Sequence, residues 1–258
     1  MPEKKIDLSG NSGLPLTLEG SRLLFGTGME EVQAEARAKE QMKQVLLEPN
    51  ATDAPEAFYF MHRNVCLKKD EALIAGKNLR YDVTILPAFT VGVQKEFNKT
   101  LGHFHEKVKG IGLSFTEVYE VLHGKAHYLL QNSDECFLVE ANEGEKVVVP
   151  PNFGHVTINP SKNETLAMSN WVEKNFSSDY SLYREKRGAT YFETEKGFVE
   201  NKNYRDLPVL KKVKAKKAMD AFGISSGKPM YLSFFEAPEK LDFLKEPQRF
   251  LKEFESLF

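Results

Sequence analysis

Cysteine is scarce in this chain, which has only two thiols, Cys66 and Cys136, among 258 residues. Two cysteines cannot build a disulfide framework, and their scarcity is typical of a reducing, intracellular setting. Long apolar runs are also missing. No stretch approaches the ~18–20 apolar residues of a membrane span, and residues 1–30 have no apolar core of a signal peptide. We therefore expect a soluble, cytoplasmic protein without a membrane partner.

An excess of one charge is missing too, because 35 Lys and Arg face 37 Asp and Glu, for a net charge of −2. This balance excludes a strongly basic nucleic-acid arm and an acidic tail, so we expect no nucleic-acid partner. The basic run at 211–217 is interpreted as a solvated face. A hydrophobic share of 41%, with 19 Phe, is enough for a sizeable core in one large or two small domains.

The pattern along the chain changes twice. Residues 30–47 are rich in Glu, Gln, Ala, Lys and Arg and contain neither Gly nor Pro, which predicts a helix. From Phe58 to about Met168, short runs rich in Val, Ile, Phe, Tyr and Thr alternate with turn signals, which is typical of a sandwich or barrel.

Two further patterns concern single elements. Residues 117–122 and 126–130 flank a turn that contains Gly124, which predicts an antiparallel hairpin. The segment from Pro247 carries a helical stripe that we expect to pack on the barrel or on a partner subunit. Its members are Phe250, Leu251, Phe254, Leu257 and Phe258.

A set of metal-ligand residue types lies in the strand-rich region. His103 and His105 are two apart, so on a strand both imidazoles point to the same face. Glu117 and His155 follow on later predicted strands, and inward faces of a small barrel would bring all four together. Imidazoles with one carboxylate suit Fe(II), Mn(II), Ni(II) or Zn(II) and leave coordination positions open for substrate oxygens.

The other three histidines are set aside as ligands. His123 and His127 flank the predicted turn and are expected to be exposed, and His62 has no partner in sequence.

The segments that carry these residues resemble the two cupin motifs. The first is built on His-x-His with a following Glu-x6-Gly, and the second on Gly-x5-Pro with a later His-x3-Asn. More narrowly, 100–105, 117–126 and 148–159 look like the cupin-type glucose-6-phosphate isomerases. Asn152 stands where the second cupin motif has glycine. The gap between His105 and Glu117 is also longer than in most cupins, so we expect residues 107–114 to form a loop at the barrel mouth.

The resemblance covers about residues 20–195 and implies a mainly β fold, the cupin double-stranded β-helix or jelly-roll barrel. On this basis we divide the chain into an N-terminal helical region at 1–57, a barrel with the metal site at 58–199, and a mixed C-terminal extension at 200–258. The family also implies a homodimer.

The resemblance implies a role for each site residue. The metal ligands would be His103, His105, Glu117 and His155. The substrate-binding residues would be Thr84, Thr100, Gly102, Tyr59, Tyr119 and Tyr180, although core packing explains Tyr59 and Tyr180 equally well. Hydroxyls and backbone N–H groups can hold a phosphate without a lysine cluster.

The implied reaction is the metal-dependent interconversion of glucose 6-phosphate and fructose 6-phosphate, an aldose–ketose isomerisation of glycolysis and gluconeogenesis. Fe(II) is the first choice of metal. Glu117 is the candidate for moving the proton, with a hydride shift as the alternative. Three other functions stay open: a cupin Fe(II) dioxygenase, a mannose-6-phosphate isomerase, and a non-catalytic sugar-binding cupin.

Overall fold

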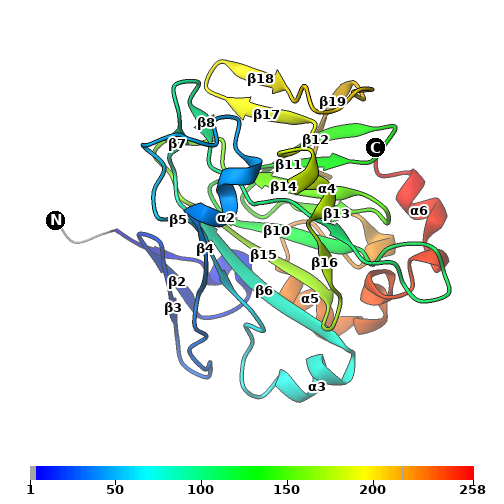
Figure 1. Cartoon of the computed structure of the whole chain (residues 1–258). Helices are drawn as coiled ribbons and strands as arrows, with labels where there is room; N and C mark the ends of the chain where they lie inside the picture. Colours follow the sequence, from blue (N-terminus) through cyan, green and yellow to red (C-terminus); the bar gives the residue numbers. More distant parts are fainter. Residues whose placement is uncertain (1–3, 217) are drawn as a thin grey trace.

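Two β-sheets form the body of the molecule, whose computed structural model describes residues 4–216 and 218–258 (Figure 1). The larger sheet has the strand order β13-β10-β15-β6-β5-β4, and all its neighbours are antiparallel. Its strands are β4 (Glu35–Ala38), β5 (Ala57–His62), β6 (Leu79–Leu86), β10 (Glu117–His123), β13 (Lys146–Val149) and β15 (Leu166–Glu173).

The second sheet has the order β14-β11-β12-β19, in which β19 runs parallel to β12. Its strands are β11 (Lys125–Gln131), β12 (Cys136–Asn142), β14 (Gly154–Ile158) and β19 (Leu210–Lys214). Smaller sheets flank these two. They are made of β1 (Lys5–Asp7), β2 (Leu16–Glu19) and β3 (Arg22–Phe25); of β7 (Thr90–Val91), β8 (Glu96–Phe97), β17 (Tyr191–Thr194) and β18 (Gly197–Glu200); and of β9 (Phe104–His105) with β16 (Ser178–Asp179).

Helices are short in the described chain. The α-helices are α1 (Ser9–Ser12), α2 (Lys39–Met42), α3 (Glu71–Gly76), α4 (Ser181–Glu185), α5 (Met230–Glu236) and α6 (Leu251–Glu255). Turns of 3-10 helix cover Lys43–Val45, Asp220–Phe222, Pro238–Leu244 and Pro247–Arg249. Among the residues described, no helix is both long and apolar enough to cross a membrane.

The barrel interior lies between the two main sheets. Side chains of β10 and β15 that point inward, such as Tyr119 and Met168, pack against Tyr128 of β11 in one buried cluster. Successive strand residues point to opposite faces, so the same strands carry a second apolar face on the outside. The predicted mainly β cupin barrel is thus confirmed.

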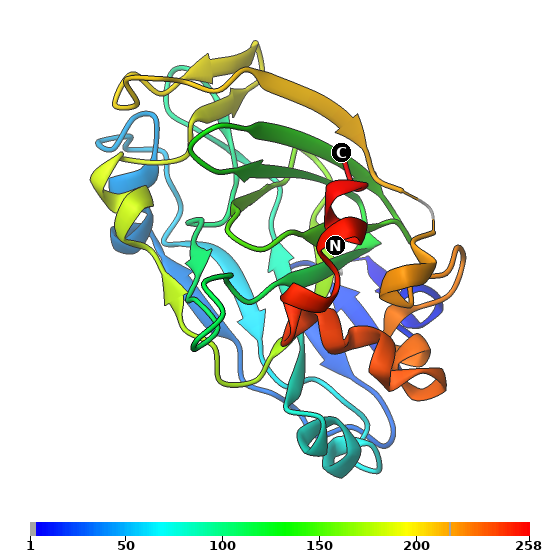
Figure 2. The same ribbon diagram turned by 90° about the vertical axis from the view of Figure 1, so that its right-hand side faces the viewer.

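The outer face of the larger sheet is covered by both ends of the chain. Trp171 of β15 stacks on Phe234 of α5 with ring centroids 4.9 Å apart, and its indole N–H donates to the carbonyl of Met230. Leucines of the N-terminal sheet belong to the same buried cluster. In Figure 2 the segment after β19, coloured orange to red, crosses the face turned to the viewer. The C-terminal residues therefore form part of the main core.

The helix predicted over 30–47 is wrong. The described chain there forms β4, one turn of α-helix and one turn of 3-10 helix. Arg37 of β4 lies opposite Tyr59 of β5, and its guanidinium donates to the tyrosine hydroxyl. Pairing with β5 and this buried contact outweigh the local helix propensity, which is only a weak determinant when tertiary contacts compete.

The hairpin predicted around Gly124 is also wrong. Strand β10 pairs with β13 and β15, whereas β11 pairs with β12 and β14, so the chain crosses from one sheet to the other at this turn. Gly124 has φ 82°, which suits a tight turn whether the chain returns to the same sheet or crosses to the other one. His127 is buried and contacts Glu193 at 2.9 Å, contrary to its expected exposure.

The C-terminal stripe is partly helical, since α6 holds only Leu251 and Phe254 of its five members. Phe254 and Leu257 are buried against the outer cluster, while Leu251 and Phe258 are 46% and 39% exposed. The basic run forms the edge strand β19, whose lysines 211, 212 and 214 are exposed as expected; residue 217 lies outside the described chain. Lysines on an edge strand hinder pairing with another chain.

Candidate metal centre

Four side chains from separate strands meet inside the barrel. His105 lies on β9, Glu117 begins β10 and His155 lies on β14, while His103 forms a bridge to His155 by backbone hydrogen bonds in both directions. One donor atom from each of the four lies within 4.8 Å of the others. The structure thus brings together the four ligands that the spacing predicts.

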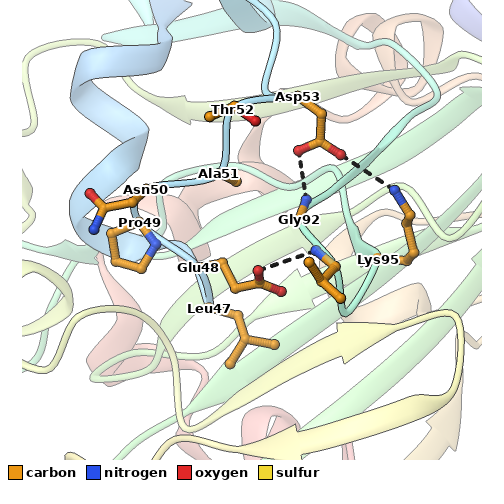
Figure 3. A pocket seen from close by; sticks show the side chains of 10 residues that line it. Leu47, Glu48, Pro49, Asn50, Ala51, Thr52, Asp53, Gly92 and Lys95 are labelled. Atoms are coloured by element: carbon orange, nitrogen blue, oxygen red, sulfur yellow. Dashed lines mark hydrogen bonds and ion pairs between the residues drawn. The ribbon is translucent and has the colours of Figure 1, made fainter.

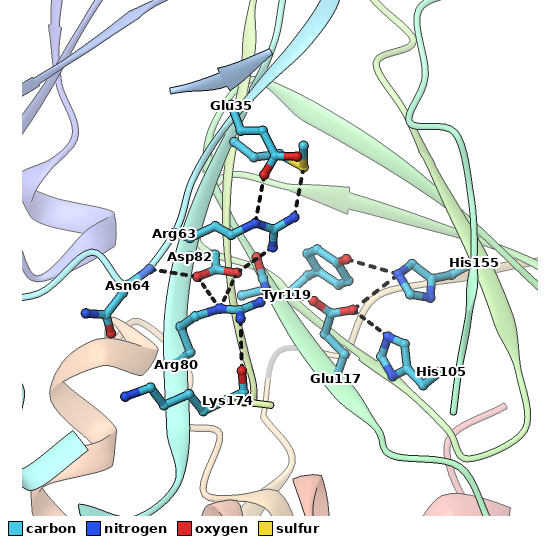
Figure 4. A network of polar contacts seen from close by, with 12 residues as sticks. Glu35, Arg63, Asn64, Arg80, Asp82, His105, Glu117, Tyr119, His155 and Lys174 are labelled. Carbon is cyan, nitrogen blue, oxygen red and sulfur yellow. Dashed lines mark hydrogen bonds and ion pairs between the residues drawn. The ribbon is translucent and has the colours of Figure 1, made fainter. Parts of the chain in front are cut away.

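The rings of His105 and His155 point toward the carboxylate of Glu117 (Figure 4). The Nε2 atoms of His105 and His155 each lie 3.2 Å from Oε2 of Glu117. Ring centroids of His103 and His155 are 4.4 Å apart, and those of His103 and His105 are 5.1 Å apart. Phe176 packs on His105 at 4.4 Å and covers this side of the cluster.

Hydrogen bonds behind the cluster set the state of its donors. The Nδ1 atom of His105 lies 3.1 Å from the carbonyl of Phe115, which can only accept, so in the neutral ring Nδ1 carries the proton and Nε2 keeps its lone pair. Burial, together with repulsion from His155 and His105, holds the pKa of His103 well below its ordinary value. The imidazole of His103 is therefore neutral near pH 7, as a metal ligand must be.

Glu117 is ionised. Burial would raise the pKa of this carboxyl, but hydrogen bonds from the facing nitrogens of His105 and His155, when these carry a proton, outweigh burial and lower the pKa below its ordinary value. Within the described chain, Nε2 of His105 and Oε2 of Glu117 are buried and form no well-aligned hydrogen bond. Lone pairs that face each other in this way are stabilised by a cation between them, so the residues fit a divalent ion of the kind that prefers mixed nitrogen and oxygen ligands.

The predicted substrate residues lie around one pocket next to this cluster. The cavity is narrow, with a volume of about 60 Å³. It is lined by all six of them, Tyr59, Thr84, Thr100, Gly102, Tyr119 and Tyr180, together with His103, Glu117 and His155. The substrate-binding roles of these six residues stay predictions, and their common location at one pocket agrees with the predicted roles.

Eight lining residues were not predicted from the sequence: Met61, Arg63, Arg80, Asp82, Met168, Asn170, Phe176 and Ser178. Asp82 accepts hydrogen bonds from Arg80 at 2.9 Å and from Arg63 at 3.3 Å, and Arg63 also pairs with Glu35 (Figure 4). Arg80, Asp82 and Thr84 alternate along β6, so the period of two marks them as one face. The sequence does not reveal that this face lines the pocket.

Gly102 has a conformation that other residues rarely adopt. Its φ is 83°, and a Cβ atom there would lie 2.5 Å from Val156 and 2.9 Å from Tyr183. The chain can therefore pass close to β14 only with glycine here, and this close approach sets the position of His103.

Asn152, which stands where the cupin motif has glycine, has a positive φ of 66°. Its side-chain oxygen accepts from the Ser114 N–H at 3.0 Å, and its own N–H donates to the Ser114 hydroxyl at 2.7 Å. These two hydrogen bonds hold Ser114, at the end of the segment 107–114, against Asn152. The segment forms a loop, as expected. Asn tolerates the left-handed region better than other non-glycine residues.

Asn152→Val is expected to lower the free energy of unfolding by about 2 kcal/mol, because a β-branched residue is strained at positive φ. Asn152→Gly should stay within about 1 kcal/mol of the original chain, since relief of backbone strain offsets the lost hydrogen bond. Urea denaturation measures both. Equal losses in the two variants would show that backbone strain is not the cause.

Two other places in the described chain gather acidic side chains: a hollow near the surface and a histidine–glutamate group. A hollow bounded by 47–53 and 92–95 has its carboxylates already engaged. Asp53 accepts from the Gly92 N–H and from Lys95 (Figure 3), and Glu48 accepts from the N–H groups of Val93 and Gln94.

The second feature is a group made of His123, Glu143 and Glu164. It lies on the surface, and both ring nitrogens of His123 face carboxylates. Neither feature has the buried, unpaired donors of the barrel centre.

Fold and site together define a cupin barrel with a three-histidine, one-glutamate centre beside a narrow pocket. A family model described as "Glucose-6-phosphate isomerase (GPI)" matches residues 36–209, and the chain belongs to this family of enzymes. No curated protein matches the chain in sequence.

Solved structures with a similar arrangement were also found. Vicilin from Solanum lycopersicum (tomato) has a TM-score of 0.38 at 11% identity, over 59% of this chain and 36% of that one. The polyketide cyclase RemF from Streptomyces resistomycificus has a TM-score of 0.35 at 14% identity, over 58% and 79%. An oxalate decarboxylase has a TM-score of 0.34 at 12% identity, over 59% and 33%. The chain spans about a third of the length of the vicilins it matches.

Proposed function

We propose that this protein interconverts glucose 6-phosphate and fructose 6-phosphate with a divalent metal ion held by His103, His105, Glu117 and His155. The observation that carries the proposal is the convergence of four donors, three of them on buried side chains, on a pocket of a chain that belongs to the isomerase family. We propose Fe(II) as the metal and a cytoplasmic homodimer as the working form, in glycolysis or gluconeogenesis.

The reaction moves a hydrogen between C1 and C2 of the sugar and shifts the carbonyl, so negative charge develops on O1 and O2. A bound divalent ion supplies Lewis-acid stabilisation of this charge. The chain contributes a site lined by aromatic rings, among them Phe176 and Tyr180 beside His103, at centroid distances of 6.4 and 5.5 Å. Exclusion of water by these rings strengthens electrostatic stabilisation in the pocket.

Glu117 is the proposed proton carrier between C1 and C2. Because its pKa lies below the ordinary value, it is in the ionised form that a base requires, although it is a weak base. The C–H bond must therefore be acidified by polarisation of the adjacent carbonyl. Tyr119, whose pKa is raised well above its ordinary value by burial and by Glu117, stays protonated and can donate to a substrate oxygen.

The phosphate end of the pocket is proposed to lie at Tyr59, Thr84, Thr100, Gly102 and Tyr180. The hydroxyl oxygen of Tyr59 accepts hydrogen bonds from the Arg37 guanidinium at 3.1 Å and from the Leu101 N–H at 3.4 Å. With its lone pairs engaged, the hydroxyl proton is free to donate to an anion. Arg37 is 7% exposed and adds positive charge behind this tyrosine.

A coupled assay of fructose 6-phosphate conversion tests the proposal. The metal-loaded protein should form glucose 6-phosphate, lose activity on chelation and regain it when the ion is restored. Mannose 6-phosphate, which differs from glucose 6-phosphate only at C2, is the matched substrate for specificity. A metal-loaded protein that turns over neither sugar phosphate, or that consumes oxygen instead, would contradict the proposal.

A further inference from the structure

Asn170 occupies an unusual position for its side chain. It lies on the inner face of β15, between Met168 and Val172, and is 5% exposed. Asparagine is depleted in strands, and burying an amide is costly unless its hydrogen bonds are satisfied. The register places it opposite Tyr119 on one side and Asp82 on the other, in the middle of the larger sheet.

The side-chain amide of Asn170 is hydrogen-bonded to Glu117, one of the four residues of the metal centre. Its Nδ2 donates to Oε1 of Glu117 at 2.6 Å, a contact that diagonal neighbours on adjacent strands can make. An ionised carboxylate only accepts, so the amide nitrogen must face it. The other oxygen, Oε2, faces His105 and His155 at 3.2 Å each. The two oxygens of Glu117 thus have different partners.

We propose that Asn170 is a positioning residue that restricts Glu117 to metal coordination through a single oxygen. Carboxylates bind metals through one or both oxygens, and a two-oxygen mode would occupy a coordination position that the substrate needs. The bond from Asn170 fixes the rotation of the carboxylate and keeps Oε1 out of the coordination sphere. The inference rests on the metal centre of the proposed function but requires no turnover.

Binding of Co(II) to the full chain tests the inference, because the visible absorption of this ion reports its coordination. Asn170→Leu keeps the side-chain volume but removes the donor. Its Kd for Co(II) should rise about tenfold or more, as is typical when a hydrogen-bond partner of a metal ligand is lost. The Co(II) spectrum should also change. A Kd within twofold of the original chain with an unchanged spectrum would overturn the proposal.

Two controls separate this role from simple packing. Ser169→Ala alters the neighbouring buried residue on the opposite face of β15 and should leave the Kd for Co(II) unchanged. If Asn170 were only structural, Asn170→Leu would lower the Tm with an unchanged Kd, which also overturns the proposal. A chain that binds Co(II) as expected but isomerises no sugar would refute the proposed function and leave the role of Asn170 standing.

Discussion

Replacing His155 with alanine is expected to abolish metal binding and isomerisation together. His155 is the ring on which the other ligands converge, because it touches Glu117 at 3.2 Å, lies 4.4 Å from the His103 ring and contacts the Tyr119 hydroxyl at 3.0 Å. Removing one of four ligands also leaves the ionised Glu117 with one fewer partner in a buried site.

The expected loss in kcat/KM is about 10³-fold or more, because several kcal/mol of charge stabilisation depend on the bound ion. His123→Ala is the matched control, since its ring lies at the surface beside Glu143. Elemental analysis and the coupled assay read out the two effects. Retention of metal and activity in His155→Ala would show that the centre is assigned to the wrong residues.

Deleting residues 202–258 is expected to prevent folding altogether. The deletion removes β19 and the C-terminal aromatic side chains of the outer cluster, among them Tyr231, Phe234 and Phe243. Trp171 would lose Phe234 and the Met230 carbonyl, and buried Glu120 would lose the hydrogen bond from the Met230 N–H. A large exposed apolar face of this kind leads to aggregation.

Solubility and near-ultraviolet circular dichroism measure this outcome. Phe234→Ala is a milder form of the same test, with an expected loss of about 3–5 kcal/mol in the free energy of unfolding. Leu232→Ala on the same helix is the matched control, because Leu232 is 42% exposed and should cost far less. A truncated chain that is soluble, cooperative and active would contradict the role assigned to the C-terminal residues.

Much of the metal centre could be predicted because its signals are local. The alternation of strand side chains places His103 and His105 on one face, and the double proline at 150–151 ends β13 just before His155. Such features depend on neighbouring residues only.

Asn170 and Asp82 could not be found in this way. They reach the site because β15 pairs with β10 and β6, and that register depends on the whole sheet.

The two errors in secondary structure have related causes. The segment 30–47 has helix-forming composition, but pairing of Arg37 with Tyr59 at the sheet edge determines its conformation. Gly124 marks a turn correctly, yet a turn signal does not say whether the following strand returns to the same sheet or crosses to the other. In both places long-range contacts outweigh local sequence preference.

The central claim is that one divalent ion in the barrel centre enables isomerisation. Titration of metal-free protein with Fe(II) under exclusion of oxygen, with fructose 6-phosphate conversion as the readout, tests it most directly. Activity should rise linearly and level off at one equivalent of Fe(II) per chain. Full activity in the metal-free protein, with no response to added ion, would contradict the claim.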